Sequence, residues 1–413
     1  MDKRYRLNDI LRIALALCII YFFNGCTSGF IKGNRIVTLF VYGCIAIWFL
    51  LLMGNRDYWR RYFHYQLPII ICELIIGFLI LIDREKNSQA FSNDFTVIGY
   101  TLILASIFWY FADKQKSAGR KIIVKFWVLD TVIASVYSIY RLQENPLISR
   151  YLSRGDAELW LAGLDVKGIV TYPVIYGLVL VISVLTYLAF DNKVSKIKCI
   201  SLIVLYYSTV LASQFTIGLI TATISIILMI LIKKQENNKV LWVAIILIAV
   251  LVSVNIVPLL KWIISLRVLP TAVEMRIDDI VRALSASSMV NTADLGNRLR
   301  LYQQSIDAIF DNYFLGTGLV GHGQVGNHSE LLDAIGNYGI LYAVLYVSYY
   351  LRIIKWLKSQ IDEEYLKLYT ITFIIYIFLS FVNNTLFAAT FLAFSVIIPL
   401  TLIELHQTAN YSQ

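Results

Sequence analysis

The segment IVTLFVYGCIAIWFLLLM, from Ile36 to Met53, decides the fold because it is long, apolar and free of charged residues. A helix rises about 1.5 Å per residue, so such a run covers most of the ~30 Å hydrocarbon core of a bilayer. Similar runs recur along the chain, which is 58% hydrophobic and only 15% charged. Soluble domains carry about a quarter charged residues. The composition therefore predicts a polytopic membrane protein.

Twelve runs have the length and apolar character of a membrane-spanning helix. They cover residues 8–29, 36–53, 67–82, 95–112, 122–142, 169–190, 199–214, 217–232, 240–260, 331–354, 366–383 and 386–404. The pair 199–214 and 217–232 admits two interpretations, namely two short helices joined at Gln214-Phe215-Thr216 or one broken element. We predict an all-α bundle of about twelve transmembrane helices that forms a single membrane domain over residues 1–413.

Lysine and arginine residues gather in alternate connections between these runs. They lie in segments 3–6, 56–61, 114–121, 193–198, 233–239 and 355–358. Cytoplasmic loops collect such residues, so this side and both termini are predicted to face the cytoplasm. A single crossing over 199–232 would break the alternation, which favours the hairpin. Because the net charge of +9 is spread over these loops, nucleic-acid binding is not expected.

Two connections on the opposite side are long, over residues 143–168 and 261–330. Long loops in compact proteins usually carry function. In the second loop, apolar residues recur at three- and four-residue spacing from Tyr302 to Tyr313, which predicts an amphipathic helix. Asp294 is expected to cap its start, and Gly316 and Gly318 to stop it. Such a helix either lies along the surface of the outer leaflet or packs over the bundle of spans, where it could be a lid that only adds stability.

Asn327-His328-Ser329-Glu330 directly precede the run 331–354. Asn followed by Glu three residues later is typical of a capping box, with Asn327 as the N-cap and His328 as the first helical residue. Free N–H groups at a helix start attract anions, and the same field disfavours an imidazolium ion. His328 is thus a candidate proton acceptor beside a candidate diphosphate site. The alternative is that it only caps a helix at the headgroup level.

Four arginine residues are predicted on the outer side. Arg298 and Arg300 begin the amphipathic helix, and Arg150 and Arg154 lie in the other long loop. Arginine binds phosphate in a bidentate manner, although each of these residues is also compatible with a surface charge facing lipid headgroups. Only two histidines and no cysteine are expected in the outer loops, so no metal site is predicted.

Three charged residues fall inside predicted spans, namely Glu73, Lys125 and Asp130. A charge in hydrocarbon is costly, so all three are expected to face the interior of the bundle. They serve there either as structural interhelical pairs or as parts of a proton or substrate path.

The region from Gly296 to Leu341 carries a spaced set of motifs. They read Gly296-Asn297-Arg298, Gly316-Thr317-Gly318, His328-Ser329, Leu331-Leu332 and Gly339-Ile340. This pattern resembles the bacterial O-antigen polymerase and ligase superfamily, whose polymerases also build capsules and exopolysaccharides. The region is about a tenth of the chain, and the number of spans, the late large loop and the short hairpin extend the resemblance. Two positions differ: Ser329 stands where the family usually has Asn, and Gln214 where the hairpin often has Arg.

The resemblance implies a polymerase that transfers a growing glycan from undecaprenyl diphosphate to a lipid-linked repeat unit. The reaction would occur on the outer face of the bacterial cytoplasmic membrane, with no metal, nucleotide sugar or other cofactor. His328 would orient or deprotonate the acceptor hydroxyl, and Arg298 would neutralise the diphosphate. The residues expected to bind substrate or diphosphate are Arg300, Arg154, Arg150, Gln214, Asn327 and Glu330. Membrane lipids, a chain-length regulator and a flippase are the candidate partners.

Three other functions stay open. A flippase or another secondary transporter for lipid-linked oligosaccharides also has about twelve spans. An O-antigen ligase of the same superfamily shares the motifs. A polyprenyl-phosphate-sugar glycosyltransferase of the other multispan type keeps acidic residues in its first outer loop. The corresponding segment here, Gly25 to Arg35, contains no Asp or Glu, which argues against that third function.

Overall fold

The computed structural model of the protein describes most of the chain. The described residues are 7–23, 34–82, 88–144, 148–149, 152, 167–191, 194–234, 256–267, 269, 273–275, 277–278, 281–282, 293–320, 325–385 and 388–411. Every regular element among them is helical, and eight helices are long and apolar enough to cross a membrane. The chain is therefore a multi-pass helical membrane protein, as its composition predicts.

The helices follow the predicted runs closely. Their bounds are α1 Leu7–Phe23, α2 Arg35–Leu52, α3 Arg56–Ile82, α4 Ser88–Phe111, η2 Lys114–Lys116, α5 Ser117–Glu144, α8 Tyr172–Leu188, α9 Lys196–Ala212, α10 Thr216–Lys234, α12 Ile256–Ser265, α14 Ala293–Asp311, α15 Gly316–Val320, α16 Glu330–Leu357, α17 Glu363–Val382, α18 Ala388–Phe391, η4 Leu392–Ile397 and α19 Ile398–Tyr411. Each predicted run except 240–260 coincides with helix, and most of that run lies outside the described residues.

Helix α3 begins well before the predicted start at residue 67. Its first turns are rich in aromatic residues that have polar atoms, so a search for apolar runs passes over them. Tyr58 donates its hydroxyl hydrogen to the carbonyl oxygen of Ser106 at 3.1 Å, and Tyr62 donates to that of Leu102 at 3.1 Å. These bonds hold the early turns of α3 against α4, which stabilises the helix from Arg56 onward, before the apolar run begins.

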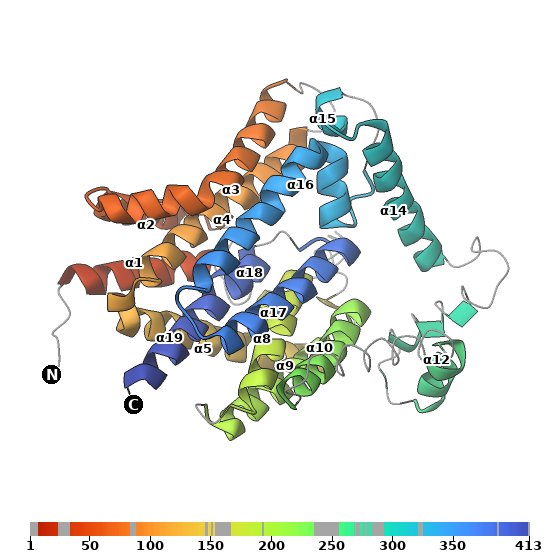
Figure 1. Ribbon diagram of the computed structural model, residues 1–413. Coiled ribbons are helices and arrows are strands. Elements are labelled where there is room, and N and C mark those ends of the chain that lie inside the picture. The colour runs from red at the N-terminus through yellow and green to blue at the C-terminus, as the bar shows by residue number, and fades with distance from the viewer. Residues whose placement is uncertain are drawn as a thin grey trace.

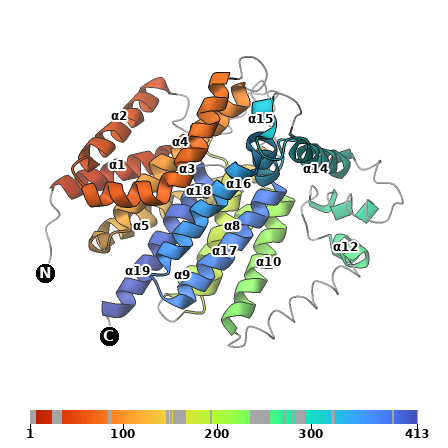
Figure 2. The same cartoon turned by 45° about the horizontal axis from the view of Figure 1, so that its top comes forward.

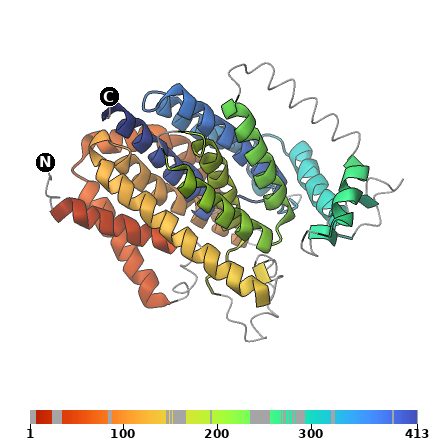
Figure 3. The same ribbon diagram turned by 90° about the horizontal axis from the view of Figure 1, so that it is seen from below.

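The two ends of the bundle differ in content. Both termini lie at one end, and α14 and α15 lie at the other (Figure 1). The turned views show the same arrangement, with α12 also far from the termini (Figures 2 and 3). Between the ends, α8 packs against α9, α10, α17 and α18 and is buried along nearly its whole length. The position of both termini at one end is what an even number of membrane crossings would produce.

The segment 199–232 forms two helices, α9 and α10, as the charge pattern favours. Gln214 in the turn between them has φ 58°, a left-handed conformation that reverses the chain. Its neighbour Phe215 contacts the ring of Tyr172 at the start of α8, with ring centroids 6.4 Å apart. The hairpin tip therefore lies at the first turn of α8.

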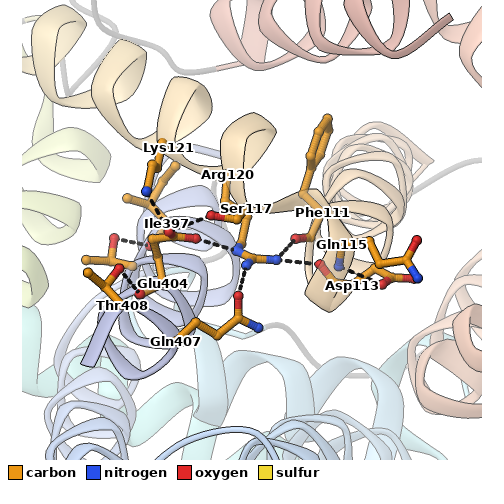
Figure 4. A network of polar contacts seen from close by, with 11 residues as sticks. Phe111, Asp113, Gln115, Ser117, Arg120, Lys121, Ile397, Glu404, Gln407 and Thr408 are labelled. Atoms are coloured by element: carbon orange, nitrogen blue, oxygen red, sulfur yellow. Dashed lines mark hydrogen bonds and ion pairs between the residues drawn. The ribbon is translucent and has the colours of Figure 1, made fainter. Parts of the chain in front are cut away.

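The end that holds the termini is fastened by a polar network centred on Arg120 (Figure 4). The guanidinium is fully buried and donates from Nε to Glu404 Oε2 at 3.1 Å. It also donates to the carbonyl oxygens of Phe111 and Asp113, at 2.9 and 2.5 Å, and to the side chain of Gln407. The network joins the start of α5 to the last turns of α19.

The three intramembrane charges occupy different surroundings. Asp130 is buried, and Glu73 is half-buried with Oε2 lacking a hydrogen-bond partner within the described part of the chain. Lys125 is exposed, so the prediction that it faces the interior is wrong. It lies about two turns from the start of α5, and its long stem is able to carry the ammonium group toward the membrane surface.

Candidate functional site

Helix α14 forms the roof of the candidate site, and its bounds differ from the prediction. It begins at Ala293, so Asp294 lies inside the first turn and does not cap the helix. It ends at Asp311, before the glycines, and Gly316 instead starts the short helix α15. Gly316 has φ 71°, and a Cβ there would collide with the backbone oxygen of Asn337. The absence of a side chain at Gly316 therefore lets the backbone of α15 lie directly against that of α16.

A break in α16 receives the connection after α14. Gly339 has φ 79° and ψ 174°, which interrupts the helix. The backbone N–H of Ile340 then donates to the carbonyl oxygen of Tyr313 at 3.0 Å. A Cβ at Gly339 would collide with the carbonyl oxygen of Phe314, so only glycine fits. The Gly339-Ile340 motif therefore has a structural cause: it anchors the outer loop to the span below it.

The start of α16 differs from the predicted capping box. The N-cap is Ser329, whose Oγ accepts from the N–H of Leu332 at 3.3 Å, and Glu330 is the first helical residue. Asn327 has φ 55°, so it turns the chain two residues before the cap. Asp333 accepts from the N–H of Ser329 at 2.8 Å and from the hydroxyl of Ser305 in α14 at 2.5 Å. Asp333, absent from the predicted box, thus ties α14 to this turn.

His328 lies beside Arg298 and Tyr302, which are one turn apart on α14. The ring centroids of Tyr302 and His328 are 6.2 Å apart. Burial lowers the pKa of His328 below its ordinary value, the positive charge of Arg298 lowers it further, and a hydrogen bond with the Asn327 backbone opposes both. The imidazole is therefore neutral at pH 7. Burial is the larger cause, and the positive charge of Arg298 is the smaller one. Its Nε2 atom is buried and has no hydrogen-bond partner in the described structure.

Tyr302 connects the roof to the end of α17. Its hydroxyl donates to the carbonyl oxygen of Val382 at 2.6 Å. Burial raises the pKa of Tyr302, whereas the charge of Arg298 and a hydrogen bond with it lower that pKa. Arg298 thus interacts with both Tyr302 and His328, and its charge also reaches Tyr176 in α8.

Glu330 is buried, and both of its oxygen atoms are already occupied. Oε1 accepts from the hydroxyl of Tyr346 at 2.5 Å. Oε2 accepts from the N–H of Thr385 at 2.8 Å and from the hydroxyl of the same residue. Asn383, in the same connection, donates its side-chain N–H to Tyr176 at 2.5 Å. Glu330 therefore joins α16 to the segment between α17 and α18, and a contact with substrate stays a prediction.

Gln214 lies at the same end of the bundle, because Phe215 contacts Tyr172 one turn before Tyr176 on α8. The side chain is only 7% exposed, and its Oε1 has no hydrogen-bond partner among the described residues. An unsatisfied buried oxygen and a left-handed φ each cost about 1–3 kcal/mol. Such costs are typical of a position that has a function.

The remaining arginines are not brought to His328. Arg300 is exposed. It follows Arg298 by two residues, which corresponds to a rotation of about 200° around the helix axis, so the two side chains point to opposite sides of α14. Arg150 and Arg154 lie outside the described residues. Ile148 in their loop and Ile169 directly after it belong to a buried cluster that packs with Ala212 at the hairpin tip. Among the predicted phosphate ligands that the structure describes, Arg298 is thus the one whose charge acts on the histidine.

Tyr302, Asn383 and Thr385 are not among the predicted site residues, but the structure places them at the site. The spacing of Tyr302 predicts only a position on the apolar face of the amphipathic helix, although its hydroxyl makes a polar contact. Asn383-Asn384-Thr385 interrupt two apolar runs, and three consecutive polar residues at a span boundary are a usable signal.

No protein-family model matches this chain, and no curated protein matches its sequence.

Proposed function

We propose that this protein is a polysaccharide polymerase of the O-antigen or capsule type. It would transfer a growing glycan from undecaprenyl diphosphate to a lipid-linked oligosaccharide on the outer face of the bacterial cytoplasmic membrane. One observation carries the proposal: the buried, unpartnered Nε2 of a neutral His328 lies beside Arg298 at the end of a helical membrane bundle. A proton acceptor next to a phosphate ligand is the pair that this transfer requires.

In the proposed reaction, an acceptor hydroxyl oxygen attacks the anomeric carbon of the donor glycan. Its bond to that carbon forms while the bond from the carbon to the diphosphate oxygen breaks. The hydroxyl proton goes to His328 Nε2, and undecaprenyl diphosphate leaves with the bonding electron pair. Arg298 offsets the negative charge that develops on the diphosphate. Direct displacement inverts the anomeric configuration, and the transfer uses no metal, nucleotide sugar or other cofactor.

Several other residues support this arrangement. Tyr302 holds Arg298 near His328, and Gln214 offers a buried oxygen atom that a substrate hydroxyl would satisfy. Lateral surfaces of the bundle would hold the polyprenyl tails, so positioning supplies much of the rate. A flippase and a chain-length regulator are the expected protein partners.

The test is His328→Ala in a host strain that lacks the chromosomal copy. General-base catalysis contributes about 10²–10⁴-fold to a rate, so long polymer should disappear while single repeat units and the protein level persist. His64→Ala is the matched control, because that histidine is exposed on α3. Polymer of normal length from His328→Ala would remove the histidine from the mechanism.

Arg298→Lys tests the phosphate contact separately. A lysine keeps the charge but loses the paired donors of a guanidinium, so polymer should be much reduced if the contact is bidentate. Normal polymer from this variant would indicate that charge alone is needed. Inverted membrane vesicles distinguish a transporter, which would move the lipid-linked unit without lengthening it.

A further inference from the structure

A polar cavity of about 50 Å³ opens beside the candidate site, along the first half of α16. Asp94 of α4 lines it together with Asn327, Glu330, Asn337, Tyr338 and Tyr342. Asn327 and Glu330 are close neighbours of His328 in sequence, so the cavity lies next to the turn that carries the candidate base, although His328 itself does not line it. A water molecule needs about 10–15 Å³ of such space, so the cavity has room for a few waters.

The wall of this cavity presents hydrogen-bonding atoms that the protein leaves unused. Tyr342 is 2% exposed, and its hydroxyl has no hydrogen-bond partner within the described residues. That hydroxyl lies close enough to Asp94 and Glu330 for their charges to act on it. Asp94 accepts from Tyr338 through Oδ2 at 2.5 Å, which leaves Oδ1 available. Asn337 accepts from Thr317 at 3.4 Å, which leaves its amide hydrogens available.

The charge of the wall limits which ligand fits. Asp94, Glu330 and Asp333 all line the cavity and no lysine or arginine of the described chain does, so an anionic diphosphate finds no cationic ligand there and belongs instead beside Arg298. A bare metal ion is also a poor match, because no three Asp, Glu, His or Cys side chains among the described residues are arranged so that they could hold one ion. Mixed donors and acceptors with tyrosine rings suit a hydroxylated, uncharged molecule.

We propose that this cavity binds one edge of the acceptor sugar and so presents the attacking hydroxyl to His328. The inference rests on the proposed polymerase function and adds a specificity to it. The small volume admits one or two hydroxyl or hydroxymethyl groups in place of the waters, and the rest of the sugar stays at the mouth. Because the wall is acidic, it accepts a neutral or amino sugar and excludes a uronic acid.

The test uses membranes that contain the full chain and a lipid-linked repeat unit purified from the deletion strain. Initial rates against repeat-unit concentration separate KM from kcat. Tyr342→Phe should raise KM about 3- to 10-fold with kcat unchanged, which corresponds to the loss of one hydrogen bond. Its melting temperature should not change, since the ring contacts with Tyr338 and Tyr346 remain. Asp94→Asn should raise KM in the same way.

Two further variants keep the test decisive. Tyr349→Phe, a buried α16 tyrosine that meets Gln66 outside the cavity, should match the wild-type KM. Ala343→Leu fills the cavity from a buried wall position and should abolish transfer without lowering the melting temperature.

The outcomes separate the two proposals. Wild-type KM in Tyr342→Phe, Asp94→Asn and Ala343→Leu, with His328→Ala inactive, would overturn the cavity assignment and leave the polymerase intact. Absence of polymer from the wild-type chain would instead overturn the proposed function. A uronic acid at the acceptor end of the host's repeat unit would also contradict the assignment, and a neutral or amino sugar there supports it.

Discussion

Arg120 and Arg298 lie at opposite ends of the same bundle, and their surroundings are different. Arg120 is fully buried, and each of its terminal nitrogens and Nε donates to a protein oxygen. Arg298 is partly exposed, and the histidine beside it keeps a buried nitrogen without a partner in the described structure. Gln214, at the same end of the bundle, keeps an unpaired buried oxygen as well. The fully paired guanidinium of Arg120 therefore fastens the helices, whereas the unpaired nitrogen of His328 and the unpaired oxygen of Gln214 lie where a substrate is expected.

The largest expected effect is at the paired end. Glu404→Gln leaves the buried Arg120 without its anionic partner, so the free energy of unfolding should fall by about 3–5 kcal/mol. Thermal unfolding in detergent micelles measures the loss. Glu363→Gln is the matched control, because that side chain is 82% exposed and its pair with Lys367 should contribute at most about 1 kcal/mol. Equal melting temperatures for both variants would contradict the structural role of the network.

The next effect concerns the joint between the outer loop and α16. In Gly339→Ala an alanine must adopt a left-handed backbone conformation with its Cβ against the carbonyl oxygen of Phe314. The free energy of unfolding should fall by about 1–3 kcal/mol, and the end of α14 should be displaced. Polymer should be lost although helix content by circular dichroism is retained. Gly43→Ala in α2 meets no atom within 4 Å and should be neutral or slightly stabilising. Unchanged polymer in Gly339→Ala would show that the docking of α14 is not needed.

The titration of His328 gives a third, smaller effect. Its pKa lies below the ordinary value of 6.5, so the neutral, proton-accepting form persists at pH 6.5 and above. The rate of polymerisation should therefore be flat above that pH and fall on acidification through the lowered pKa, by about tenfold per unit, or 1.4 kcal/mol. In Arg298→Gln the residual rate should fall at a higher pH, because the nearby positive charge is gone. An acid limb at the same pH in both proteins would contradict the electrostatic link.

The smallest effect is expected at the unpaired oxygen of Gln214. Gln214→Met removes the unpaired oxygen while keeping side-chain length, so unfolding should cost about 1 kcal/mol more than in the wild type. Polymer yield should nevertheless fall, since a substrate contact is lost. A gain of stability with a loss of activity is typical of a functional position. Lower stability in Gln214→Met would indicate that the oxygen has a structural partner.

The length of the apolar runs and the charge of the loops are local properties of the chain, so they suffice to predict a helical membrane protein. The sequence also indicated the hairpin 199–232 and the motifs around His328. Tertiary structure alone decided that Ser329 caps α16, that Gly339 breaks it and that Lys125 is exposed. It alone placed Arg298 rather than Arg300 by the histidine and occupied both oxygens of Glu330. These features depend on contacts between groups far apart in sequence, such as the hydrogen bond from Ile340 to Tyr313. The spacing of residues along the chain does not predict such contacts.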